Sequence, residues 1–187
     1  MEQEHKKIII NPRVIKHLGR DLITSPDVAI IELIKNSIDA KASNVRLCLF
    51  ENGHVLENTE SFLSPVCIKE IFEMVPSSFF NEPLLVVEDN GKGMNDLQLE
   101  KGFLEIGTDL KSSNKEITLG EKGIGRLATQ RLGKYLLVET ASETESFATL
   151  TFIDWNNISN ADNSDYFVPY KKIEKTGSSY TRLWILG

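Results

Sequence analysis

Apolar and polar positions repeat with a helical period over residues 27–40, which read DVAIIELIKNSIDA. On a helical wheel the small and apolar side chains cover a wide arc, whereas Glu32, Asn36 and Asp39 fall in one narrow polar sector. A Ser-Pro pair just before the segment supplies an N-terminal boundary. Because a surface helix usually has a broader polar face, the pattern predicts a helix buried on most sides with one polar slot. The alternative is a solvated stripe on an ordinary core helix.

Two strands are predicted on either side of a region that is hard to interpret. Residues 45–50 alternate and are rich in strand formers, and residues 84–88 form an apolar run typical of a buried central strand. Between them, residues 51–83 contain an Asn-Gly turn signal and are interrupted by prolines, with a short helix predicted near 68–74. We interpret residues 51–83 as an insertion without recognisable chemistry.

The second half of the chain changes from helical to strand patterns. Helices are predicted over 96–104 and 126–132, strands over 136–140, 147–155 and 181–186, and loops over 108–119 and 156–165. A further short helix is predicted within residues 10–20. Helices followed by a run of strands, without an internal repeat, predict an α+β sandwich rather than alternating βαβ units.

Composition narrows the class of protein. With 187 residues, of which 41% are hydrophobic, the chain can form one full core, or one domain and the start of another. A net charge of −6 argues against a general phosphate-backbone binder, although Arg126, Arg131 and Lys134 could form a local basic patch. Cys48 and Cys67 lack metal-ligand spacing and are expected to be reduced. The longest apolar runs are far short of a membrane span, so a cytoplasmic protein is expected.

Asp89 directly follows the predicted central strand and precedes Gly91 and Gly93. A carboxylate at the end of a buried strand can accept a hydrogen bond from a donor such as a nucleobase amino group. The two glycines let the backbone approach a flat ligand without a Cβ in the way. Asp-Asn-Gly is also a very common turn sequence, and a simple turn is the alternative interpretation.

Gly120, Gly123 and Gly125 form a G-x-x-G-x-G run that opens a predicted helix. Successive amides in such a loop, together with a helix N-terminus, can hold phosphate oxygens. The run lacks the Gly-Lys-Ser/Thr ending of a Walker motif and does not follow a strand as a Rossmann fingerprint does. A flexible loop that ends at a helix start is the alternative.

Two residues of the first helix could carry chemistry. The amide oxygen of Asn36 suits a hard cation such as magnesium, which keeps waters and shares phosphate oxygens. Glu32, one turn away, could take a proton from an attacking water. Its alternative role is a structural ion pair with Lys35.

ELIKNSIDA, EDNGKGM and GEKGIGRLA, in this order, resemble three motifs of the GHKL superfamily: gyrase, the heat-shock chaperone of the same ATP-binding fold, histidine kinases and MutL. The resemblance covers the chain from about residue 11 to its end. It implies an α+β fold of the Bergerat type, a two-layer sandwich whose mixed, mostly antiparallel sheet is covered on one face by helices. Residues 1–187 would form one ATP-binding domain, with the insertion at about 51–83 and with downstream domains missing.

The resemblance also implies roles for individual residues. Glu32 would be the general base, Asn36 the magnesium ligand and Asp89 the adenine anchor, while residues 108–119 would form the ATP lid. The other residues implied in nucleotide binding are Asp39, Ala40, Gly91, Gly93, Met94, Thr108, Lys111, Gly120, Lys122, Gly123, Ile124, Gly125 and Thr181. The family usually has a Gly-Thr pair on a late strand, whereas Gly177 is followed here by a serine, so Thr181 is the best candidate for that threonine.

The presence of Glu32 and the NSxDA pattern resemble the ATPase branch, since histidine kinases lack that glutamate. The resemblance therefore implies a domain that binds Mg-ATP and hydrolyses it slowly, with lid closure acting as a switch that drives homodimerisation of a larger protein. Gyrase and MutL take a catalytic lysine from a following domain, and this chain ends at Gly187. A histidine-kinase-like phosphotransfer domain and a non-hydrolysing, nucleotide-gated binding module are the alternatives. The client, DNA or protein, is left open.

Overall fold

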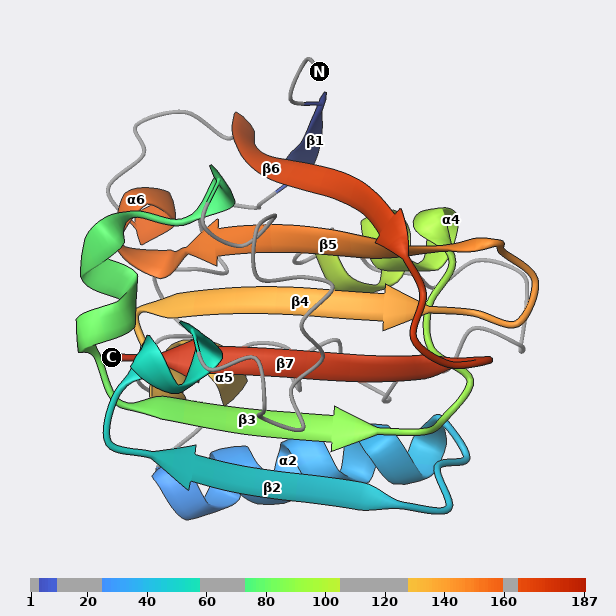
Figure 1. The fold of residues 1–187 in the computed structure, drawn as a ribbon, viewed down its shortest axis with the longest axis horizontal. Coiled ribbons are helices and arrows are strands. Elements are labelled where there is room, and N and C mark those ends of the chain that lie inside the picture. The colour runs from blue at the N-terminus through green and yellow to red at the C-terminus, as the bar shows by residue number, and fades with distance from the viewer. Residues whose placement is uncertain (1–3, 10–24, 58–72, 105–127, 160–164) are drawn as a thin grey trace.

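A computed structural model describes residues 4–9, 25–57, 73–104, 128–159 and 165–187 of the chain. The strands in these ranges form one seven-stranded sheet in the order β1-β6-β5-β4-β7-β3-β2 (Figure 1). Their bounds are β1 (Glu4–Ile9), β2 (Val45–Phe50), β3 (Leu84–Asp89), β4 (Tyr135–Ala141), β5 (Phe147–Asp154), β6 (Asp165–Glu174) and β7 (Tyr180–Leu186). Every pairing between these strands is antiparallel. The predicted α+β fold with a mostly antiparallel sheet is confirmed.

The helices lie on one face of the sheet, and Figure 1 views the molecule from the opposite face. They are α2 (Pro26–Asp39), α4 (Asp96–Gln98), which continues into the π-helical turn η4 (Leu99–Leu104), α5 (Ala128–Leu132) and the short α6 (Trp155–Ser159). Ala29, Leu99 and Ala128, one from each of three helical segments, are fully buried against strand residues such as Val138, and we call this cluster the helix-side core. The apolar sides of these helices thus form one continuous layer over the sheet.

A second apolar cluster, the outer core, covers part of the opposite face. Two turns of 3₁₀ helix, η1 (Gly53–Glu57) and η3 (Ser77–Asn81), belong to the region between β2 and β3. The rings of Phe79 and Phe80 from η3 pack there with Leu137 and Trp184 of the sheet. The described parts of residues 51–83 therefore supply core side chains. Whether the region is an insertion stays a prediction.

Helix α2 differs from its prediction in burial. Its described range agrees with the predicted helix, but only Ala29, Leu33 and Ser37 are buried, and Ile31 and Ile38 are 54% and 59% exposed. The prediction of a helix buried on most sides is wrong. In a two-layer fold a helix packs against the sheet along one stripe and turns its opposite side outward, whatever residues that side carries.

Two strands, β1 and β6, were not predicted. The sequence of β1 is dominated by charged residues, and β6 contains Pro169, which normally disfavours a strand interior. Trp155 begins α6 rather than ending β5, so the predicted loop over 156–165 contains a helical turn. The remaining strand predictions are confirmed to within two residues. The predicted helix within 10–20 and most of the one at 68–74 lie outside the described residues.

Across the part of the chain that is described, none of the helices has both the length and the apolar character needed to cross a membrane. Cys48 is a free thiol, as expected, whereas Cys67 falls outside the described ranges.

Candidate functional site

The antiparallel register brings Asp89, Thr181 and Thr140 into one row across three neighbouring strands. Asp89 of β3 pairs with Thr181 of β7, which pairs in turn with Thr140 of β4. The two threonine hydroxyl oxygens lie 3.3 Å apart. The row faces the helix layer, because Ser37 of α2 reaches Asp89. We call Asp89, Thr181 and Thr140 the site row.

The Asp89 carboxylate is held in place by two donors and is 7% exposed. The Ser37 hydroxyl donates to Oδ2 at 3.0 Å and the Gly91 amide donates to Oδ1 at 2.9 Å. Burial raises the pKa of this carboxyl, and the two hydrogen bonds oppose the rise. Since an ionised carboxylate has about four lone-pair positions, Asp89 keeps acceptor capacity for a ligand donor.

Ser37 was not singled out from the sequence, where it is one more small residue in the apolar arc. In the structure it is 3% exposed, and its hydroxyl lies within 3.3 Å of the Leu33 carbonyl as well as bonding Asp89. A hydroxyl in the middle of an apolar stripe was the signal that could have identified it, because a buried polar group needs a partner.

The Asp-Asn-Gly sequence forms a tightly held connection at the end of β3. The Asn90 side-chain oxygen accepts from the amides of residues 43–44 at 3.0 and 2.8 Å, and the Lys92 amide donates to the Ala40 carbonyl at 2.9 Å. A Cβ on Gly91 would come within 2.8 Å of both the Ala40 Cβ and the Ala40 oxygen. The turn therefore packs against the C-terminal end of α2, and at Gly91 the approach is too close for a side chain.

Gly93 and Met94 connect this turn to β4. Gly93 has φ of +61°, and a Cβ there would lie 1.9 Å from the Ala141 carbonyl oxygen. The Met94 amide donates to the Thr140 hydroxyl at 2.8 Å, and that hydroxyl donates to the Tyr180 carbonyl at 3.1 Å. Thr140 was not predicted as a site residue. Thr140 comes next to Thr181 only through the pairing of β4 with β7, which the sequence does not reveal.

We expect Gly93→Ala to destroy the site. A side chain at positive φ is strained, and the clash with the Ala141 carbonyl forces residues 90–94 away from β4. The free energy of unfolding should fall by about 1–3 kcal/mol, and ligand binding at the Asp89 carboxylate should be lost. Chemical denaturation and ligand titration check this, with Gly177→Ala as the matched control, because the nearest atom to a Cβ at Gly177 is 3.5 Å away. Equal effects of the two substitutions would contradict the expectation.

The polar residues of α2 belong to the helix that reaches the site row through Ser37. Glu32 has a side-chain exposure of 31% and pairs with Lys35 at 2.8 Å, which raises the pKa of the lysine. Asn36 is half-buried and Asp39 is exposed. This ion pair is the structural role that the sequence analysis gave for Glu32 as the alternative to a general base. Ion pairs between exposed side chains are weak, so Glu32 can exchange this partner for another.

Several predicted site residues lie outside the described ranges: Thr108, Lys111, Gly120, Lys122, Gly123, Ile124 and Gly125. Helix α5, which follows the glycine-rich run, packs against α2. Among the described residues there is no group of three or more histidine, cysteine or acidic side chains that could hold a metal.

Two of the three basic residues considered from the sequence, Arg131 and Lys134, lie away from the site row. Arg131 and Lys134 line a hollow of about 230 Å³ beside Trp155 and Gly187. Gly187 follows the last residue of β7, whereas Thr181 of the site row is near that strand's start. The Lys134 ammonium is paired with Glu82 at 3.1 Å. Arg126 is outside the described residues, so the predicted three-residue patch remains untested.

The described geometry suits a flat ligand with an amino group. A fixed, buried carboxylate supplies the acceptor, and the turn next to it presents glycine backbone where side chains would not fit. A helix-covered antiparallel sheet with this arrangement at the end of β3 is characteristic of a GHKL-type ATP-binding domain. Residues 23–181 match the family described as histidine kinase-, DNA gyrase B- and HSP90-like ATPases, and because the match spans most of the chain, the protein belongs to that family.

A solved structure titled "Crystal Structure of N terminal domain of a DNA repair protein" is similar to this chain, with a TM-score of 0.53 and 17% sequence identity. The similarity covers 92% of this chain and 38% of that chain, and at this identity it shows a shared fold. No curated protein matches the sequence closely enough to count as a relative. The family match confirms the resemblance drawn from the three sequence motifs.

Proposed function

We propose that this domain binds Mg-ATP and hydrolyses it slowly. The observation that carries the proposal is the Asp89 carboxylate, buried at the end of β3, fixed by Ser37 and Gly91, and next to a turn that excludes side chains. The adenine amino group would donate to Asp89, and Gly91, Gly93 and Met94 would form the wall of the base pocket. Thr181 and Thr140, in the same row, would complete the polar floor beneath the base.

Hydrolysis would depend on α2. Asn36 would hold a magnesium ion shared with phosphate oxygens, and the bound cation would supply charge neutralisation at the phosphates. Glu32 would leave Lys35 and accept a proton from the attacking water, which needs a carboxylate within hydrogen-bond reach of that water. Ala40 and Asp39 lie at the end of α2, where the Ala40 carbonyl fixes the base-pocket turn. The glycine-rich run at residues 120–125 would hold phosphate oxygens.

The activity of a larger protein is a further part of the proposal. The chain spans 38% of the solved structure it resembles, whose title names a DNA repair protein. A lid over residues 108–119, ATP-dependent homodimerisation and a lysine from a downstream domain would then turn nucleotide binding into a switch. A DNA client is one option and a protein client another, and a cytoplasmic location remains a prediction from composition.

One observation favours a second candidate, a module that binds nucleotide without hydrolysing it. Glu32 already has a partner in Lys35, and a general base needs a free carboxylate. Such a module would bind ATP as the first proposal requires but would release no phosphate, even as part of a longer protein.

Calorimetric titration with a non-hydrolysable ATP analogue, with and without magnesium, tests the binding proposal. We expect saturable, one-site binding that magnesium strengthens, because the cation links the phosphates to Asn36. An absence of binding to a folded domain of residues 1–187, repeated with a longer chain, would overturn the proposal. Binding that is indifferent to magnesium would remove the assigned role of Asn36.

A further inference from the structure

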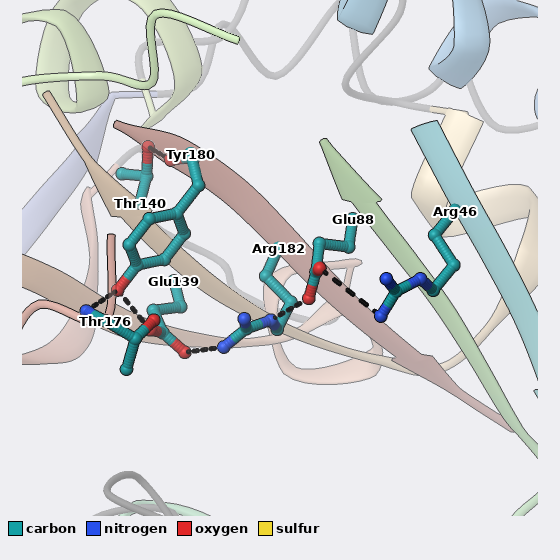
Figure 2. Close-up of polar contacts among 7 residues, drawn as sticks. All are labelled: Arg46, Glu88, Glu139, Thr140, Thr176, Tyr180 and Arg182. Carbon is teal, nitrogen blue, oxygen red and sulfur yellow. Dashed lines mark hydrogen bonds and ion pairs between the residues drawn. The ribbon is translucent and has the colours of Figure 1, made fainter. Parts of the chain in front are cut away.

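A second cross-strand row lies directly behind the site row, on the other face of the sheet. Arg46 of β2 pairs with Glu88 of β3, Glu88 with Arg182 of β7, and Arg182 with Glu139 of β4. Figure 2 shows the four side chains in sequence, positive and negative in alternation. We call Glu88, Arg182 and Glu139 the charged row, and Arg46 lies next to its Glu88 end without belonging to it.

Arg182 bridges the two carboxylates of the charged row. Its Nε donates to Glu88 at 2.5 Å, and its Nη1 donates to Glu139 at 3.1 Å (Figure 2). The exposed fraction of the side chain is 8% for Arg182 and 0% for Glu139, so this is a buried ion pair. Arg46, whose side chain is 50% exposed, is 3.8 Å from Glu88.

The guanidinium is also held between two rings. Its central carbon is 5.3 Å from the Tyr180 ring centroid and 5.7 Å from that of Trp184. Burial by itself lowers the pKa of Arg182, but the Glu139 and Glu88 carboxylates outweigh it, so the net shift is upward. Arg182 is therefore permanently charged and restricted in position, as a planar group with a fixed set of donors can be.

Each residue of the charged row is the sequence neighbour of a residue in the site row. Glu88 precedes Asp89, Arg182 follows Thr181, and Glu139 precedes Thr140. Because successive residues of a strand point to opposite faces, the two rows lie back to back on the same three strands. Whatever sets the spacing and register of the charged row sets those of the site row as well.

Tyr180 connects the two rows directly. Its hydroxyl donates to Glu139 of the charged row, and its carbonyl oxygen accepts from Thr140 of the site row (Figure 2 shows both residues). The Thr176 amide donates to the same hydroxyl at 3.3 Å. Burial, then the Glu139 charge, raises the pKa of Tyr180, so it remains a neutral donor. A shift of Glu139 is thus transmitted to Thr140, which holds the Met94 amide.

Stability alone is a poor explanation of the charged row. Buried ion pairs often contribute no more than well-packed apolar residues of similar volume, because both charges lose their hydration. The outer face around the row is otherwise apolar, with Leu137 and Trp184 fully buried. Leucine or methionine would fit such a face. A directional bridge across three strands provides something that apolar packing does not, which is a defined geometry.

We infer that Arg182 is a positioning residue for base recognition, bridging Glu88 and Glu139 so that Asp89, Thr181 and Thr140 keep the geometry that selects an adenine amino group. The inference rests on the proposed ATP binding. It predicts that loosening the charged row lowers base selectivity, since the acceptor of the amino group is displaced while phosphate contacts remain.

The test compares ATP with inosine triphosphate, which has a carbonyl oxygen in place of the adenine amino group. The main variant is Arg182→Met combined with Glu139→Gln, which removes both buried charges of the pair and retains side chains of similar length. We expect ATP affinity to fall about tenfold, the effect of weakening one hydrogen bond to a charged group. Affinity for inosine triphosphate should change much less, so the selectivity ratio falls about tenfold.

Two further variants complete the design. Arg46→Met removes the exposed cation that pairs with Glu88 but leaves both hydrogen bonds of Arg182 in place, and it should leave the selectivity ratio unchanged. Arg182→Lys keeps the charge but cannot donate to both carboxylates in one plane, and it should lower the ratio by a smaller factor. Thermal unfolding shows which variants are folded at the titration temperature. If the double variant is unfolded there, Arg182→Lys alone decides the question.

Folded variants that retain the parent selectivity would overturn the inference, and so would equal losses of affinity for the two nucleotides, which indicate general destabilisation. These results leave the proposed function intact, because the parent still binds ATP. A parent that binds neither nucleotide overturns the proposed function instead, and the positioning role with it. A selective loss of ATP affinity in the folded variants supports the inference.

Discussion

Glu32→Gln is expected to leave ATP binding intact and to slow hydrolysis by about a hundredfold to ten-thousandfold, the usual contribution of a general base. The amide keeps the size and hydrogen-bonding shape of the side chain but cannot accept a proton from water at neutral pH. Glu32 is 31% exposed and its ion pair is with the exposed Lys35, so among the described residues the substitution removes no buried ion pair. Phosphate release at saturating Mg-ATP and calorimetric affinity are the two measurements.

Lys35→Met is the matched control for this prediction. It removes the partner of Glu32 without removing the carboxylate, so hydrolysis should be unchanged or faster, because the base is then free. Turnover that persists unaltered in Glu32→Gln would favour a kinase-like phosphotransfer domain. If neither the parent nor Lys35→Met releases phosphate while both bind ATP, the non-hydrolysing module is the better description.

Asp89→Asn is expected to weaken ATP binding by about tenfold to a hundredfold or more, the range for losing a hydrogen bond to a charged acceptor. The substitution exchanges one carboxylate oxygen for an amide nitrogen, which is itself a donor. One of three donors then loses its acceptor: the Ser37 hydroxyl, the Gly91 amide or the adenine amino group. Titration with the non-hydrolysable analogue measures the effect.

Asp154→Asn serves as the control for Asp89→Asn. Asp154 also accepts backbone and side-chain hydrogen bonds, from Asn156 and Asn157, but at a half-buried position just before α6. Its substitution makes the same chemical change away from the site row and should not alter nucleotide affinity. Unaltered ATP binding by Asp89→Asn would remove Asp89 as the adenine anchor.

The raised pKa of Asp89 adds an expectation about stability. Because the folded-state pKa lies above the ordinary value of 3.8, the stabilising contribution of this group is fully present below pH 3.8 and is lost as pH rises through the folded-state pKa. In Asp89→Asn the group does not titrate. Denaturation at a series of pH values should therefore show the variant gaining stability relative to the parent as pH rises from below 3.8 toward neutral. The opposite trend would show that the ionised carboxylate stabilises the free domain.

Local patterns were sufficient for the elements next to the site. The 3.6-residue period gave α2, and runs of strand-forming residues gave β2, β3, β4 and β7, because these preferences act over a few neighbouring residues. The three motifs in order were enough to indicate the family. The same patterns could not give β1 and β6, whose charged residues and proline oppose the strand state locally and which form by pairing with each other and, for β6, with β5.

The sequence by itself determined the class of protein, the helix that carries Glu32 and Asn36, and the place of Asp89 between a buried strand and a glycine turn. Only the tertiary structure decided which residues Asp89 meets. Ser37 is 52 positions away from it along the chain, and the alignment of Thr181 and Thr140 with Asp89 depends on the register of strands distant in sequence. The charged row behind them was invisible for the same reason. Register is set by the summed pairing of whole strands, so no single segment contains it.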